Sequence, residues 1–467
     1  MNGRAAKIVD RALAAVAAVL VASLVVAAWH DVSKAWDVWY YHLPFAGRIV
    51  GLLDPDAYAF GRLNQARYDG FPLLGEALQG LLWRITGRVE CAAFVSLAAL
   101  PGIAWFLHRA EKVPLHVTAL ALLAIPLVQI HATGCYVDLP ANTCVTLLII
   151  LIYRQVVRRE PPPLRVMIGA AALAAAAANM KFQLVPVVVV ASLVLVVIAL
   201  RRDEERLGRL LVVTLALPLV FATPLKNLAL HGNPVWPVEL RVLGHTFPHL
   251  EGAYASSPDW LAALPGPVRW AASVLELGLR PIASHARWSL DQWTPPRETG
   301  YRMGGFFGAY VVVNIVALAA AVIVQRSRES KVALAFMAGA SVMASLLPQA
   351  HELRYYLFWM LLLVALNLIV WARARRVTVG LVALGALAVV AWSTGGTYLR
   401  ASGDSFATLV ADHVDVQALD RLGPAERICI ARAPWTFLYA PRFHPGRHYA
   451  VQEAESLSEC GDARPLD

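Results

Sequence analysis

Long apolar blocks alternate with short polar segments along most of the chain. An α-helix needs roughly 20 residues to cross the hydrocarbon core of a bilayer, and the blocks are close to that length. Eleven of them can be delimited, at residues 12–29, 89–107, 114–131, 135–153, 164–180, 182–200, 210–228, 305–325, 331–348, 354–371 and 377–393. The pattern predicts an all-α polytopic membrane protein with about 11 transmembrane helices.

Positive charge alternates from one connection to the next. If the N-terminus is cytoplasmic, five short connections face the cytoplasm, and all of them are basic, as the positive-inside rule requires. They contain Arg109 and Lys112; Arg154, Arg158, Arg159 and Arg165; Arg201, Arg202, Arg206 and Arg209; Arg326, Arg328 and Lys331; and Arg373, Arg375 and Arg376. The sequence therefore predicts a multi-pass protein of the bacterial inner membrane with a cytoplasmic N-terminus and a periplasmic C-terminus.

The long polar segments all fall on the opposite, outer face. We expect a transmembrane domain over residues 1–393, with outer loops at 30–88 and 229–304, and a small periplasmic module over 394–467. Charged groups are costly within lipid, so function is expected in such outer segments.

Local patterns predict the contents of the outer segments. In the first loop, the aromatic residues from Trp36 to Tyr41 suggest a stretch that lies along the headgroups, followed by surface helices at 44–53 and 72–86. Glu76 is expected on the solvated face of the second of these helices. In the tail, a helix at 412–422 and a strand at 427–431 indicate a small α/β fold.

The tail also contains two of the five cysteines, Cys429 and Cys460. An oxidising periplasm would allow them to form a disulfide, although two free thiols fit the sequence equally well.

Composition supports the membrane assignment. The 467 residues are 58% hydrophobic and 16% charged, whereas soluble domains carry about 25% charged residues. The formal net charge of +9 does not indicate a nucleic-acid partner, because the Lys and Arg residues cluster between the apolar blocks.

Charged residues from five separate parts of the chain fall at the outer membrane interface. They are Asp37, Asp138, Lys181, Lys226, and the group His351, Glu352 and Arg354. A lipid-linked sugar phosphate presents its phosphate at this depth, where Lys or Arg can bind it. A carboxylate can act as general base toward an acceptor hydroxyl. Carboxylate oxygens could also hold a divalent metal, Mg or Mn, although the sequence fixes none.

Several segments resemble the GT-C superfamily of glycosyltransferases, most closely the bacterial relatives of protein O-mannosyltransferase and aminoarabinose transferase. The segments are Asp37 to Pro44, Tyr136 to Pro140, Met180 to Phe182, Lys226 to Pro237, and Arg354 with Tyr355. The resemblance covers most of the chain. It implies a glycosyltransferase that moves a sugar, a hexose or a pentose, from a polyprenyl-phosphate donor, with inversion, to a periplasmic glycan, lipid or protein acceptor.

Candidate roles follow from the matched positions. Asp37 and Asp138 are the candidate catalytic residues, and would also be the ligands of any metal. The candidate substrate-binding residues are Tyr41, His42, Lys181, Lys226 and Arg354. Many relatives carry a second acid directly after the first, whereas this chain has Val38, so either Asp138 or Glu76 could be the second acid.

Simpler interpretations remain open at each position. Asp37 and Asp138 could cap helices, and the lysines and Arg354 could extend to lipid headgroups without a substrate. Asp291, Arg297 and Glu298 in the second outer loop could line an acceptor cleft. A transporter or flippase of lipid-linked glycans, or a non-catalytic scaffold of envelope assembly, could share the topology.

Overall fold

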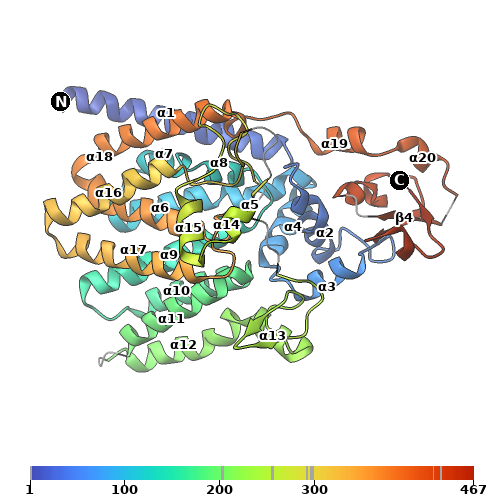
Figure 1. Ribbon diagram of the computed structural model, residues 1–467, viewed down its shortest axis with the longest axis horizontal. Helices are drawn as coiled ribbons and strands as arrows, with labels where there is room; N and C mark the ends of the chain where they lie inside the picture. The colour runs from blue at the N-terminus through green and yellow to red at the C-terminus, as the bar shows by residue number, and fades with distance from the viewer. Residues whose placement is uncertain are drawn as a thin grey trace.

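Helices dominate the structure and lie side by side along its long axis (Figure 1). The N-terminus lies at one end of this axis, and the C-terminal sheet lies at the other (Figure 1). The computed structural model describes residues 3–200, 204–253, 257–290, 293–294, 299–423, 425–431 and 434–466. Asp291, Arg297 and Glu298 lie outside this part of the chain.

All eleven apolar blocks form helices. The elements are α1 (Gly3–His30), α5 and α6 (Phe94–Leu97 and Ala99–Glu111), α7 and α8 (Leu115–Leu123 and Pro126–Ala132), α9 (Asp138–Arg158), α10 (Leu164–Ala178), α11 (Val185–Ala199), α12 and α13 (Arg206–Val220 and Ala222–His231), α16 (Gly308–Gln325), α17 (Arg328–Leu346) and α18 (Phe358–Thr394). Within the described residues, six helices are long and apolar enough to cross a membrane, or eight if each bent pair is one span. The predicted helical membrane fold is confirmed, and the count of eleven spans stays a prediction.

Three of the helical segments are broken. The α7–α8 pair bends by 101° and the α12–α13 pair by 53°. Pro126 begins α8, where it lacks the N–H that a continuous helix would use, and Pro218 lies inside α12. In α18 the backbone of Arg375 leaves helical geometry (φ −134°, ψ 36°), which divides the helix between the last two predicted spans.

The first outer loop contains three short helices, and two of them correspond to the helices expected at 44–53 and 72–86. The three helices are α2 (Leu43–Ile49), α3 (Arg62–Gly70) and α4 (Leu74–Thr86). The expectation that Glu76 is solvated is wrong, since it is only 3% exposed. Gly75 and Gly80 share the buried face of α4, and a Cβ at Gly80 would lie 2.3 Å from the carbonyl oxygen of Ala46. The helix is therefore packed closely into the protein on the face that carries Glu76.

The second outer loop contains a two-stranded antiparallel sheet and two short helices. The strands are β2 (Arg241–Val242) and β3 (His245–Thr246), and the helices are α14 (Asp259–Ala262) and α15 (Gly266–Val274).

The tail forms an α/β unit that takes in one strand from the first outer loop. Its four-stranded sheet has the order β1-β5-β4-β6, and the described strand pairs are all parallel. The strands are β1 (Tyr58–Ala59), β4 (Glu426–Ala431), β5 (Tyr449–Ala454) and β6 (Arg464–Pro465). Because β1 pairs with β5, the tail is joined to the first outer loop by backbone hydrogen bonds.

The helix expected at 412–422 is replaced by two shorter helices, α19 (Phe406–His413) and α20 (Val416–Asp420). The side chain of Asp415 accepts a hydrogen bond from the backbone N–H of Ala418 and so caps a new helix.

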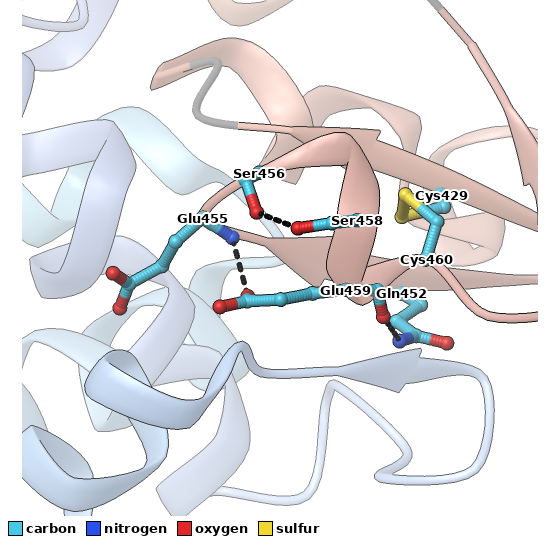
Figure 2. The surroundings of a disulfide bond; sticks show 7 residues. All are labelled: Cys429, Gln452, Glu455, Ser456, Ser458, Glu459 and Cys460. Atoms are coloured by element: carbon cyan, nitrogen blue, oxygen red, sulfur yellow. Dashed lines mark hydrogen bonds between the residues drawn. A yellow bond between two sulfur atoms is a disulfide. The ribbon is translucent and has the colours of Figure 1, made fainter.

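A disulfide joins Cys429 on β4 to Cys460 (Figure 2). Beside it, the Gln452 side chain donates to the carbonyl of Glu459, and the Glu459 carboxylate accepts from the backbone N–H of Glu455 (Figure 2). These contacts tie the segment before β6 to the end of β5.

Candidate active site

A cavity of about 680 Å³ lies where the ends of several helices meet residues of the loops at 30–88 and 229–304. Six of the seven residues proposed from the sequence line it: Asp37, Tyr41, His42, Asp138, Lys181 and Arg354. They come from the first outer loop, the start of α9, the α10–α11 connection and the segment before α18. The fold thus brings distant parts of the chain to one hollow.

Asp37 and Arg354 form the first ion pair of the cavity. An Arg354 guanidinium nitrogen lies 3.3 Å from a carboxylate oxygen of Asp37, although 317 positions separate the two residues. Asp37 directly precedes a single π-helical turn, Val38–His42, a geometry found often at functional sites. The guanidinium carbon of Arg354 also lies 5.3 Å from the ring centre of Tyr136 and 5.0 Å from that of Tyr355. These cation–π contacts help to position the guanidinium group.

Lys181 and Asp138 form the second ion pair. The ammonium group lies 2.6 Å from the carboxylate, and the two side chains are 11% and 1% exposed. Lys181 also lies 4.5 Å from the ring centre of Tyr355, the ring that Arg354 contacts. Burial lowers the pKa of Lys181, and the charge of Asp138 opposes this shift.

His42 and Glu76 make the third acid–base contact of the cavity wall. His42 Nδ1 lies 2.7 Å from a Glu76 carboxylate oxygen, and both side chains are buried. The other Glu76 oxygen has no hydrogen-bond partner among the described residues. Next to this pair, burial raises the pKa of Tyr41, and the charge of Asp37 adds to the shift, so Tyr41 stays a neutral phenol.

Sequence reasoning missed a fourth pair on the cavity wall, Arg67 with Glu251. The Arg67 guanidinium donates two hydrogen bonds to the Glu251 carboxylate, at 3.1 and 2.5 Å. The guanidinium also lies 5.5 and 5.9 Å from the ring centres of Tyr40 and Tyr41. This bidentate pair joins α3 in the first outer loop to the second outer loop. Neither residue belongs to a recognisable motif, so only the fold reveals the contact.

Asn142 is a second residue that the sequence did not identify. Its side-chain amide donates to the carbonyls of Asp138 and Arg354, at 2.8 and 3.3 Å, and accepts from the Phe358 N–H at 2.9 Å. This buried side chain therefore fixes the start of α9, which carries Asp138, against the segment that carries Arg354.

Lys226 does not line the cavity. It lies exposed on α13, and its ammonium group donates a hydrogen bond to the carbonyl of Asp69. The structure therefore separates this lysine from Lys181 and Arg354.

Glu352 lies buried two positions before Arg354. Burial raises its pKa to about 8, although the nearby charge of Arg354 opposes the shift. The raised pKa favours the neutral carboxyl group, and His351 Nε2 lies 3.6 Å from one of its oxygens.

The carboxylates of the cavity do not make a good metal site. Within the described chain, no three His, Cys, Asp or Glu side chains are grouped so that they could hold a metal ion. Asp37 and Asp138 each face a cationic side chain, which disfavours a divalent cation beside them.

The same fold occurs in known structures. The crystal structure of ArnT from Cupriavidus metallidurans in the apo state superposes with a TM-score of 0.55 and 12% identity, covering 96% of this chain and 90% of that one. The structure of ArnT from Cupriavidus metallidurans bound to undecaprenyl phosphate gives a TM-score of 0.53 and 14% identity, covering 95% and 89%. No protein-family model matches the sequence, and neither does any curated protein. The fold implied by the GT-C resemblance is confirmed.

Proposed function

We propose that this protein transfers a sugar from a polyprenyl-phosphate carrier to an acceptor outside the cytoplasm. The observation that carries the proposal is the convergence of Arg354 and Lys181 with Asp37 and Asp138 on one cavity at the outer ends of the helices. A phosphate needs cations, and an acceptor hydroxyl needs a base, so this set supplies both halves of a transfer reaction. A neighbour in fold, ArnT, has been crystallised with undecaprenyl phosphate.

The proposed reaction starts with an exchange of partners. The donor phosphate binds Arg354 and Lys181, which weakens the hold of Arg354 on Asp37. Asp37, assisted by Asp138, then removes the proton of the acceptor hydroxyl. The acceptor oxygen bonds to the anomeric carbon, and the bond from that carbon to the phosphate oxygen breaks. Its electron pair stays on the polyprenyl phosphate, where the two cations stabilise it, and the anomeric configuration is inverted.

The proposed location and membrane topology follow from the basic residues between the apolar blocks. We place the protein in the bacterial inner membrane with eleven spans, a cytoplasmic N-terminus, and the cavity and tail in the periplasm. The transferred group is a hexose or a pentose, and the acceptor is an envelope glycan, a lipid or a protein.

The test is a transfer assay with purified protein in detergent and a polyprenyl-phosphate sugar. Release of polyprenyl phosphate that depends on an added acceptor, and that Asp37→Asn abolishes, would support the proposal. If the protein moved the intact lipid-linked sugar across liposome membranes without breaking it, the protein would be a flippase instead. If it bound no donor at all, a scaffold role would remain.

A further inference from the structure

A second cavity, of about 410 Å³, lies among the membrane-spanning helices and shares no residue with the candidate active site. It is formed by α7, α16 and both halves of α18. Its wall is mostly apolar, and it also includes Asn314, Asn367 and, at the basic end, Arg375. The edge residues Val313, Val324 and Val382 are 47%, 66% and 47% exposed, so the groove opens onto the surface that lipid covers.

Hydrogen bonds fix α16 and α18 to each other at the wall of the groove. The indole of Trp371 donates to the carbonyl of Ala317 at 3.0 Å, and the Asn367 amide donates to the carbonyl of Asn314 at 2.9 Å. Because these polar groups bond across the two helices, the wall exists without a ligand. A groove of fixed shape binds at a lower ordering cost than one that must form on binding.

The charge at the end of the groove indicates its occupant. Arg375 is exposed, and none of the carboxylates in the described chain pairs with it. The next residue, Arg376, is paired with Asp10 at 3.5 Å. A cation that closes an apolar groove complements an anionic headgroup attached to an acyl chain, and basic pockets between transmembrane helices bind such lipids. A free anion would contact Arg375 alone and leave the apolar wall uncovered.

We propose that this groove binds one anionic phospholipid, with an acyl chain in the groove formed by α7, α16 and α18 and its phosphate at Arg375. The proposal is independent of the proposed sugar transfer.

The test compares phosphatidylglycerol with phosphatidylcholine of the same acyl chains, added to the full-length protein in detergent. Binding is read by native mass spectrometry and by the rise in the unfolding temperature that a ligand of the folded state produces. We expect phosphatidylglycerol to bind at least about fivefold more tightly than phosphatidylcholine, the preference that one surface cation supplies. Arg375→Gln should remove this preference. Val382→Trp should weaken both lipids, because the new side chain fills the groove.

Arg326→Gln is the matched control. Arg326 lies at the same basic end of the bundle, directly after α16, but does not line the groove. The Arg326→Gln variant should bind both lipids as the unchanged protein does. Equal affinity for the two lipids, an unaffected preference in Arg375→Gln, or the same stabilisation by inorganic phosphate alone would each overturn the proposal. If a polyprenyl phosphate bound more tightly than phosphatidylglycerol, the proposal of a phospholipid as the occupant of the groove would be wrong.

Discussion

The carboxylate of Asp37 lies 3.3 Å from the guanidinium of Arg354, which reaches it from a segment 317 positions further along the chain. In the proposed reaction this pair opens when the donor binds, so that Asp37 is released as the base.

Replacing Asp37 by Asn should therefore remove the base and keep the shape of the side chain. We expect turnover to fall by about 10²- to 10⁴-fold, the usual contribution of general acid–base catalysis. The measurement is sugar transfer by purified protein, with expression and thermal unfolding checked in parallel. Asp56→Asn, an exposed acid of the same outer loop, is the control and should keep full activity. Near-normal transfer by Asp37→Asn would exclude Asp37 as the base.

Lys181→Met should raise the KM for the lipid donor by about 10- to 100-fold, since a charge-assisted hydrogen bond contributes about 1.5–3 kcal/mol. The change also leaves Asp138 buried without its cation. The double variant Lys181→Met with Asp138→Asn should recover stability but not donor affinity. Recovery of donor affinity in the double variant would show that Lys181 acts only on folding.

Lys226→Met tests the separation of the two lysines. Lys226 is exposed and outside the cavity, so we expect the KM for the donor to change by less than about twofold, as for a surface substitution. If the KM for the donor rose as much as in Lys181→Met, Lys226 would have to be counted among the phosphate-binding residues.

The contact between the tail and the first outer loop should depend on pH through Glu453. Asn64 donates to the Glu453 carboxyl group at 2.5 Å, and the Gly61 N–H donates to it at 3.3 Å. Burial raises the pKa of Glu453 to about 7, although these hydrogen bonds and Arg67 oppose the shift.

The sign of the effect follows from linkage. The folded protein holds this proton more tightly than the unfolded chain, whose glutamate pKa is about 4.3. The stabilisation is therefore complete below that value and is lost as the pH rises through about 7. We expect the tail to unfold at a lower temperature at pH 8 than at pH 6, measured by thermal unfolding in detergent. Glu453→Gln should flatten this dependence, and an unchanged slope would exclude Glu453 as its source.

Loss of the Cys429–Cys460 bond should weaken the tail. A disulfide that closes a loop of this size contributes about 2–4 kcal/mol, mainly by restricting the unfolded chain. Cys429→Ser with Cys460→Ser should therefore increase hydrogen exchange in β4 and β5 while leaving α9 protected. Cys144→Ser, at a free thiol on α9, should leave the tail unchanged. Equal protection of β4 in both proteins would show that the bond adds nothing to tail stability.

The sequence predicts the helices well because hydrophobic length and positive loop charge are local signals. It also predicts that Asp37, Asp138, Lys181 and Arg354 lie on the same face, since topology alone determines the side on which each interhelical connection falls. Which acid meets which cation depends on helix rotation and packing, and the sequence carries no local record of either.

The incorrect predictions arise for the same reason, because the sequence carries no local record of packing. Glu76 is expected on the surface because it is a charged residue in a predicted surface helix, yet glycines at 75 and 80 let that face pack against the protein. Trp39 has the appearance of a headgroup anchor, but it is 1% exposed, and its ring centre lies 5.3 Å from that of Trp435 in the tail. The pairing of β1 with β5 joins residues almost a chain length apart, and two-residue β1 has no strand pattern of its own.

This last pairing has a consequence for biogenesis. The first outer loop leaves the ribosome early, but Glu453, which bonds to Gly61, is synthesised 392 residues later. At bacterial or eukaryotic elongation rates the interval is roughly 20 to 80 s. During that time the loop that carries Asp37 lacks its partner strand. A nascent chain can therefore complete this contact only after β5 has been synthesised, and a chain truncated before β5 would leave the first outer loop without its partner strand.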